Sequence, residues 1–453
     1  MSKVLVSFLG TSRPEKTDSG YRQYRRANYV FPDGERIESS FVALALKKHY
    51  QIDKIILIGT PKSMWEEVYY AFSGCVDDVY AEIGEFCESA NHKTKLDDFP
   101  HINEIEKSLG NGSKVVLVNY GLDSREMDEN SKKVLSLEQF LEPNDELFVD
   151  ITHSFRSLPL LLMNSLIFLR NVSSKRISIC SISYGMLDIT QEMGQTPVIE
   201  MKSILKINDW ISGASEFMGS GNAYKIADLL DSNAAATQSD LYAAKVLREF
   251  SDVLNFNYIG AIQEQVKNIR KINFEQMSEY GRLIAKPIVD AFLDRFKRAK
   301  LLSQYQYYLA EFQFAQRHYA AASLCLSEAY VSFMAECVAY KVDDKQDRLR
   351  AKNLLIGKCG KQNLVDPFFE NNCSYLKKNG ALLLGKKALG VMQPCDESQQ
   401  LKLSLRKCYT DVTDIRNEVA HSLKGDYSLD TMNKTIRDNL QYVKPYIVPD
   451  RRK

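Results

Sequence analysis

The sequence predicts an α/β domain with a mostly parallel, doubly wound sheet, followed by an all-α region. Short apolar runs alternate with helix-like stretches over residues 1–200, which is the pattern of repeated βα units. Several runs are apolar on both faces, as expected of strands that are buried between two helix layers. Past about Ile204 the strand-like runs stop, and helical periodicity continues to the end of the chain.

The expected strands are Val4–Leu9, Lys54–Ile58, Val79–Ile83, Val115–Asn119, Glu146–Asp150 and Ile177–Tyr184. The expected helices between them are Ile37–His49, Ser63–Phe72, His101–Leu109, Leu135–Phe140 and Leu158–Asn171. Val198–Met201 is expected to close a hairpin with the region from Tyr184. A long helix is expected over Gln304–Lys341, and another from Gln400, with Gly425 as its stop. We therefore expect three domains, at residues 1–204, 205–300 and 301–453.

Composition excludes several classes of protein. The 453 residues carry a net charge of +1, so there is no global basic footprint of the kind that binds duplex nucleic acid. No apolar run is long enough for a membrane span, and the first residues are too strand-like for a signal peptide. The nine cysteines are dispersed, without a C-x-x-C or a zinc-binding spacing. We expect a cytoplasmic protein with reduced thiols and no metal site.

Small and polar turns follow the expected strands, at the sheet edge where open α/β folds bind their ligands. Glycines and helix N-termini at this edge suit a ligand that carries phosphates, with Arg156 or Lys62 adding a full charge. Tyr24, Tyr29 and Phe155 are available to stack bases. The alternative is that these turns are only turns and that His153 caps a helix. No G-x-G-x-x-G or Walker pattern is present, which disfavours the usual dinucleotide and P-loop sites.

A second candidate site lies near the C-terminus, where Arg416 and His421 form the only R-x4-H spacing in the sequence. Histidine can transfer protons near neutral pH, and arginine offers a forked cation to phosphate oxygens. Their five-residue spacing places them about 140° apart on a helix, whereas Asn417 shares a face with His421 and is expected to orient it. The alternative is a solvated helix in which Arg416 pairs with Asp411 or Glu418.

Both sites resemble one known family. Phe8–Thr11 (FLGT), the tyrosine-rich Tyr21–Tyr29, Gly59–Trp65 and above all DITHSFRSLP at 150–159 resemble the CARF domains of type III CRISPR ancillary ribonucleases. This chain has Ser154 where the family has glycine. The resemblance implies a Rossmann-like CARF domain whose homodimer binds a cyclic oligoadenylate across its two-fold axis, with further assembly left open. It makes ligand-contact candidates of Gly10, Thr11, Thr60, Ser63, Thr152, His153, Ser154 and Arg156.

The C-terminal motif is similar to the HEPN ribonuclease motif R-[polar]-x-x-x-H. This similarity implies that residues 301–453 are a HEPN domain and that Arg416, Asn417 and His421 are catalytic. It also implies a composite site made by two copies, metal-independent cleavage, and a 2′,3′-cyclic phosphate product.

The predicted function is a single-stranded-RNA endoribonuclease of type III CRISPR antiviral defence. It has no cofactor, and cyclic tetra-adenylate rather than hexa-adenylate is expected to activate it allosterically, with the signal relayed through residues 205–300. The main alternative is a nucleotide-sensing regulator without nuclease activity. Two others are slow cleavage of the cyclic effector in the N-terminal domain, assisted by His153 or Ser154, and a Rossmann-type enzyme of small-molecule metabolism.

Overall fold

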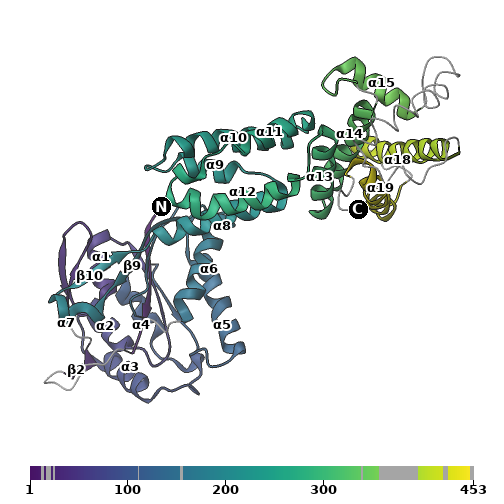
Figure 1. The fold of residues 1–453 in the computed structure, drawn as a ribbon. Coiled ribbons are helices and arrows are strands. Elements are labelled where there is room, and N and C mark those ends of the chain that lie inside the picture. Colours follow the sequence, from purple (N-terminus) through teal and green to yellow (C-terminus); the bar gives the residue numbers. More distant parts are fainter. Residues whose placement is uncertain are drawn as a thin grey trace. The chain divides into compact units, whose positions relative to one another are not determined.

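The chain forms two compact units, Met1–Asn208 and Asp209–Lys453 (Figure 1). A computed structural model describes residues 1–11, 15–16, 22–23, 26–110, 112–153, 157–337, 340–356, 396–421 and 427–448. The first unit is built on one large sheet with helices, and the second is helical in the residues described. The predicted α/β region followed by a helical region is therefore confirmed.

The sheet of the first unit has eight strands in the order β5-β4-β10-β9-β8-β1-β6-β7. Their bounds are β1 Lys3–Leu9, β4 Ala27–Val30, β5 Arg36–Ser39, β6 Lys54–Gly59, β7 Lys114–Leu117, β8 Glu146–Asp150, β9 Ser178–Gly185 and β10 Thr196–Glu200. The central strands pair in parallel, whereas β9 with β10 and β4 with β5 are antiparallel. The order reverses at β1, which places the topological switch point, and the expected ligand crevice, at the carboxyl end of that strand.

Both faces of the sheet are buried under helices. The bounds are α1 Val42–Tyr50, α2 Trp65–Ser73, α3 Asp78–Ser89, α4 Ile102–Leu109, α5 Ser124–Leu135, α6 Ser157–Asn171 and α7 Thr190–Met193. Leu5 of β1 joins a core with residues of α1–α4, while its neighbour Val6 joins a second core with α5 and α6. Alternate side chains of one strand thus enter opposite cores, which is the doubly wound arrangement that the apolar runs predict.

Three predictions about this unit are wrong, and each has a local cause. Val79–Ile83 is not a strand but part of α3, because Asp77 caps that helix by accepting a 3.0 Å hydrogen bond from the Tyr80 N–H. The expected helix Ile37–His49 begins as strand β5, since the Pro32-Asp33-Gly34 turn folds it back on β4. The expected helix Leu135–Phe140 is a short 3₁₀ stretch, Ser136–Phe140, after helix α5 that the prediction missed.

The described helices from α8 onward have these bounds: α8 Ser203–Ser220, α9 Tyr224–Asp231, α10 Gln238–Asn255, α11 Ile262–Ile269, α12 Lys286–Leu293, α13 Leu302–Ala315, α14 Tyr319–Cys337, α15 Lys345–Ile356, α18 Asp396–Ala420 and α19 Leu429–Ile447. The single helix expected over Gln304–Lys341 is two helices, α13 and α14, packed against each other. Arg317 between them has a left-handed φ of 64°, and the His318 N–H donates to the Gln313 carbonyl at 2.8 Å, which closes α13. Gly425, which was expected to end the helix that starts at Gln400, lies outside the described residues.

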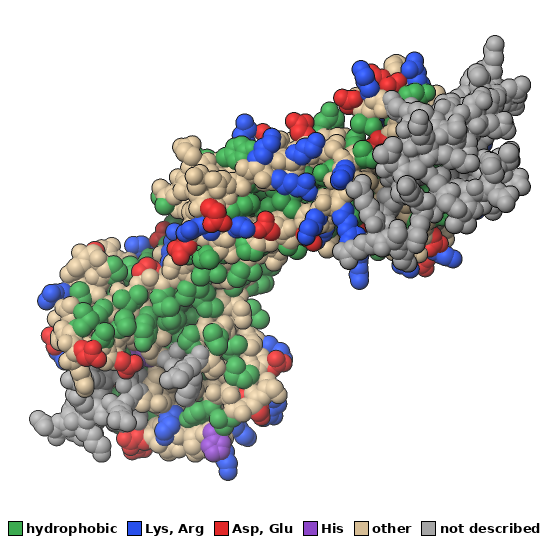
Figure 2. Space-filling model, viewed as in Figure 1, with side chains coloured by type: hydrophobic (Ala, Val, Ile, Leu, Met, Phe, Trp, Pro, Cys, Tyr) green, Lys and Arg blue, Asp and Glu red, His purple; other side chains and the backbone are tan. Residues whose placement is uncertain are grey.

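None of the helices in the described ranges is both long enough and apolar enough to cross a membrane. On the face shown in Figure 2, basic side chains gather over parts of the helical unit and are interleaved with acidic ones.

We expect Gly59→Ala to destabilise the first unit, because a Cβ at this position would lie 2.8 Å from Cζ2 of the fully buried Trp65. Overpacking of this kind costs about 1–3 kcal/mol. Urea unfolding of a chain carrying Trp210→Phe would measure it, since Trp65 is then the only tryptophan. Gly84→Ala in α3 is the control: its Cβ meets nothing closer than 3.9 Å, and it should unfold no earlier than the parent.

Candidate functional site

The turns after β1 and β6 are joined to each other by the hydroxyl of Ser63. This hydroxyl donates to the Leu9 carbonyl at 2.8 Å and accepts from the Thr60 N–H at 3.0 Å. The Met64 N–H donates to the carbonyl of Gly10 at 3.3 Å, so the two strand ends are linked twice. Thr60 and Ser63 are each only 1% exposed, whereas Thr11 is exposed. Ser63 therefore shapes this edge of the sheet from within, and its hydroxyl is already engaged on both sides.

A buried carboxylate organises the turn after β8. Asp150 is fully buried at the end of this strand, and it accepts a 2.6 Å hydrogen bond from Ser7 of β1. Its other oxygen accepts from both the hydroxyl of Thr152, at 2.5 Å, and the Thr152 N–H, at 3.0 Å. The Thr152 hydroxyl in turn accepts from the Gly185 N–H at 2.8 Å, which adds the end of β9. Burial raises the pKa of Asp150, and the bonds from Ser7 and Thr152 oppose that rise.

His153 lies directly behind the first turn, where its Cβ is 3.6 Å from the position that a Cβ on Gly10 would occupy. Its side chain is buried, and this burial lowers the pKa of the imidazole to about 4. The ring is thus neutral at physiological pH, so it carries no positive charge for a phosphate. A neutral His153 is also a poor acid for cutting a cyclic effector. Ser154 and Arg156, the remaining candidates of this turn, lie outside the described residues.

Two side chains that the sequence offers to a ligand have other roles. Tyr29 of β4 is 1% exposed in the sheet core, and burial raises the pKa of its hydroxyl. Its ring is therefore unavailable for stacking a base. Lys62 donates from Nζ to the carbonyl oxygens of Ala90 at 2.9 Å and Glu88 at 3.2 Å, which ties the second turn to the end of α3. Tyr24 and Phe155 lie outside the described residues.

Two buried acids beside the second turn escape the sequence prediction. Glu66 and Glu67 lie in the first turn of helix α2 and are 2% and 1% exposed. One oxygen of Glu67 accepts from the Ser40 hydroxyl at 2.8 Å, and the other has no hydrogen-bond partner among the described residues. Burial raises the pKa of Glu67 to about 7, and the neighbouring Glu66 adds to the rise. The sequence around both acids is that of an ordinary amphipathic helix, in which acids are expected to be exposed. The only sign of their burial in the sequence was that two adjacent carboxylates follow a tryptophan.

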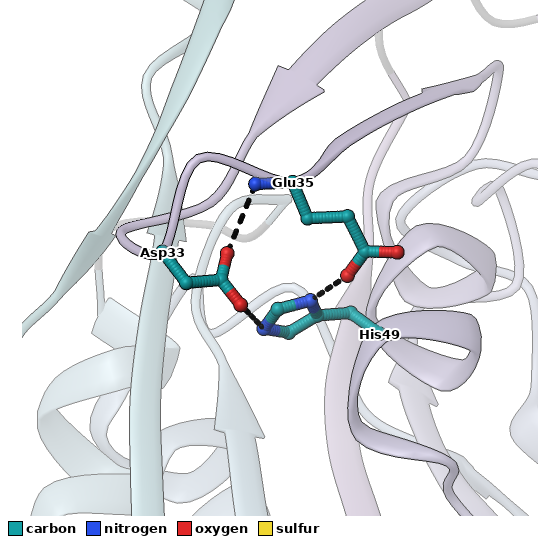
Figure 3. A group of neighbouring side chains, drawn as sticks. All are labelled: Asp33, Glu35 and His49. Atoms are coloured by element: carbon teal, nitrogen blue, oxygen red, sulfur yellow. Dashed lines mark hydrogen bonds and ion pairs between the residues drawn. The ribbon is translucent and has the colours of Figure 1, made fainter.

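Asp33, Glu35 and His49 form the one group of three possible metal ligands found in the described part of the chain (Figure 3). Glu35 contacts Nδ1 of the imidazole, whereas the Asp33 carboxylate lies 3.9 Å from Nε2, on the other side of the ring. A metal ion would need the carboxylates to converge on one ring nitrogen. The ring also stacks on Phe31, with centroids 3.8 Å apart. This group fits a clamp in which the stacked imidazole, hydrogen-bonded to Glu35, holds the β4–β5 hairpin to the end of α1.

The C-terminal motif occupies the end of α18. Tyr409, Val412 and Ile415 bury one face of this helix, which packs against α14. Arg416 is half-buried and donates from Nη1 to the Asn417 side-chain oxygen at 2.9 Å. His421 follows the last residue of the helix and is exposed. The side-chain oxygen of Asn417 thus holds the guanidinium of Arg416, and the expected role of Asn417 in orienting His421 stays a prediction.

The alternative pairing of Arg416 is not seen among the described residues. Neither Asp411 nor Glu418 forms an ion pair with it there. Arg416 instead lines a pocket between α14, α15 and α18, together with Tyr409 and Thr413 of its own helix. A forked cation beside a pocket, with an exposed imidazole at the same helix end, can contact a phosphodiester and transfer protons to or from it.

Residues 4–188 match the family model of the CARF domain of Csx1, a CRISPR system endoribonuclease. This chain carries a CARF domain. Residues 206–304 match the second domain of the CRISPR-associated protein MJ1674. MJ1674 of Methanocaldococcus jannaschii is 32% identical to the chain over 360 residues, which are 76% of this chain and 55% of that protein. The chain thus spans about half the length of this curated relative.

A solved structure, Enterococcus italicus Csm6 bound to cyclic hexa-2′-fluoro-hexa-dAMP, aligns over 99% of this chain and 93% of its own. The sequence identity is 13% and the TM-score is 0.35, a likeness too distant to place any residue.

We expect Thr152→Val to destabilise the CARF domain by about 1–3 kcal/mol, because it leaves the buried Gly185 N–H and one Asp150 oxygen short of a partner. Thr152→Ser keeps the hydroxyl and should lose much less. Unfolding in urea, followed by Trp65 fluorescence in the Trp210→Phe background, compares the two. Equal losses would show that the hydroxyl is not what matters.

Glu67 makes the stability of the CARF domain depend on pH. Its pKa is raised from 4.5 to about 7 on folding, so the folded state holds the proton longer, and stability falls as pH rises through this window. Glu67→Gln removes the effect. Its stability gain over the parent should appear above about pH 4.5 and level off above about pH 7, at about 1–3 kcal/mol. Thermal unfolding across this range tests it, and the exposed Glu85→Gln should follow the parent throughout.

Proposed function

We propose that the chain is an endoribonuclease that cleaves single-stranded RNA without a metal and is activated allosterically when its CARF domain binds a cyclic oligoadenylate. The observation that carries the proposal is the end of α18, where Arg416, held by Asn417, and the exposed His421 lie within about two helical turns. The match to the CARF domain of Csx1 supports the sensing role. The setting is antiviral defence by a type III CRISPR system.

The reaction follows from what these groups can do. The ribose 2′-hydroxyl attacks the adjacent phosphorus, and the bond to the 5′-oxygen of the next nucleotide breaks. This leaves a 2′,3′-cyclic phosphate and a 5′-hydroxyl. Arg416 stabilises the charge that grows on the phosphate oxygens, and Asn417 fixes the plane of its guanidinium. His421 moves the proton between the attacking or leaving oxygen and solvent.

A homodimer would complete this site. Arg416 and His421 point about 140° apart on one helix, so a single α18 presents only one of them squarely to a given phosphate. Two copies of α18 brought together would supply an arginine from one chain and a histidine from the other. This explains how activation can work: a ligand that favours one arrangement of the two chains favours the assembled site.

The cyclic ligand would occupy the carboxyl end of the CARF sheet. The turns that hold Gly10, Thr11 and Thr152 lie at this edge, and Thr11 is the exposed residue among them. We favour cyclic tetra-adenylate over the hexa-adenylate ring as the activator.

We expect the full chain to cleave labelled single-stranded RNA in EDTA only when one cyclic oligoadenylate is present. His421→Ala and Arg416→Ala should each lower the rate by about 10²–10⁴-fold, because they remove proton transfer and charge stabilisation. His92→Ala, an exposed histidine of the other unit, is the control and should cleave normally.

Binding of the cyclic ligand should survive in His421→Ala, and titration calorimetry would measure it with both rings. Retained binding without any RNA cleavage by the parent would favour the regulator without nuclease activity. Unchanged cleavage by His421→Ala would reject the motif as the active site.

A further inference from the structure

The pocket beside Arg416 has a volume of about 460 Å³, in the range of sites that hold small ligands. Three helices of the second unit form it: α14, α15 and α18. Its lining includes Glu328, Lys345, Arg348, Lys352, Tyr409 and Arg416. Four of these side chains are cationic and one is a carboxylate, so the pocket is strongly basic although the whole chain is almost neutral.

The single carboxylate is already neutralised. Glu328 of α14 forms an ion pair with Nη2 of Arg348. Nη1 of the same guanidinium donates to the Val342 carbonyl at 2.9 Å and to the Ser332 hydroxyl at 3.0 Å. Arg348 is therefore a fixed part of the wall that fastens α15 to α14. The positive charge that remains for a ligand belongs to Lys345, Lys352 and Arg416.

The two lysines are arranged to act together. They are seven residues apart on α15, which places them on one face of the helix and about 10 Å apart along its axis. Both are exposed, and neither forms an ion pair with any residue in the described ranges. The N-terminal turn of α15 is capped by Asp344, which accepts from the Gln346 and Asp347 N–H groups at 2.9 Å, so the lysines themselves carry the attraction for an anion.

The rest of the lining is apolar or aromatic. Val331 of α14 and Leu349 of α15 contribute aliphatic surface, and the ring of Tyr409 is 3% exposed beneath them. Arg416 and Arg348 lie close enough to Tyr409 to oppose the rise that burial causes in its pKa. A basic rim over an apolar floor matches a nucleotide, which has charged phosphates and a flat base.

We propose that this pocket binds the RNA nucleotide next to the scissile phosphate, with Lys345 and Lys352 on the phosphates and the base against Val331, Leu349 and Tyr409. The proposal rests on the function proposed above and extends it to a substrate subsite. Arg416 belongs both to this subsite and to the proposed catalytic site, since it lines the pocket and would stabilise the reacting phosphate. The lysines are positioning residues: they bind RNA and take no part in proton transfer.

The test uses the full chain with His421→Ala, so that binding is measured without cleavage. A short labelled single-stranded RNA is titrated at several salt concentrations, with the cyclic oligoadenylate present. Adding Lys345→Gln and Lys352→Gln should weaken RNA binding about tenfold. Each lost phosphate contact should reduce the slope of log K against log salt by about 0.7. Lys345→Arg with Lys352→Arg keeps the charges and should restore the slope.

The matched control removes the same charge elsewhere in the unit. Lys297→Gln with Lys434→Gln changes two exposed lysines outside the pocket and should leave affinity and slope near the parent values. In the chain that retains His421, the Lys345→Gln, Lys352→Gln variant should raise KM and leave kcat nearly unchanged, because the lost contacts exist before and during the reaction.

The outcomes separate the two proposals. Parental affinity, salt slope and KM in the double glutamine variant would overturn the pocket assignment while leaving the nuclease intact. A parent chain that binds no RNA would also overturn it. A parent that binds RNA in a lysine-dependent way but never cleaves it would support the pocket and reject the nuclease function.

Discussion

The hydrogen bonds of the buried Asp150 carboxyl group are the interaction on which the carboxyl-terminal edge of the CARF sheet depends. A carboxyl group with no access to water is tolerated only when its oxygens are hydrogen-bonded, and here Ser7 and Thr152 provide the donors. Through Thr152 the network also reaches the main chain of Gly185. Three parallel strands, β1, β8 and β9, thereby end in register around one side chain. The loops that leave this edge of the sheet start from these fixed ends.

Ser63 repeats this design on the other side of β1, where one hydroxyl joins the ends of β1 and β6. The two networks show that polar residues at strand ends can serve to hold the strands together, even at the sheet edge where α/β folds bind their ligands. Their hydroxyls are directed inward, and among the described candidate residues of this edge Thr11 is the one whose side chain is exposed.

Much of the fold could be predicted because the central strands are continuous apolar runs in the sequence and are buried on both faces in the structure. The prediction was wrong for the short apolar run Val79–Ile83. This run is helical because its apolar residues also fit the buried face of an amphipathic helix, α3, and because Asp77 caps that helix. The candidate site residues were found from motifs, but the bonds of Ser63 and Asp150 join segments more than fifty residues apart, and spacing alone does not reveal such partners. The roles of Arg416, Asn417 and His421 stay predictions.

The inward hydroxyls have a consequence for how such domains diverge. Where a ligand surface is made of backbone, substituting a side chain changes little, since every residue except proline supplies the same amide. Relatives that adopt a different cyclic ligand would have to change the length or path of the loops that leave the strands, while the serine and threonine beneath stay in place. Insertions and deletions, rather than point changes at Ser63 or Thr152, are then the route by which this edge acquires a new preference.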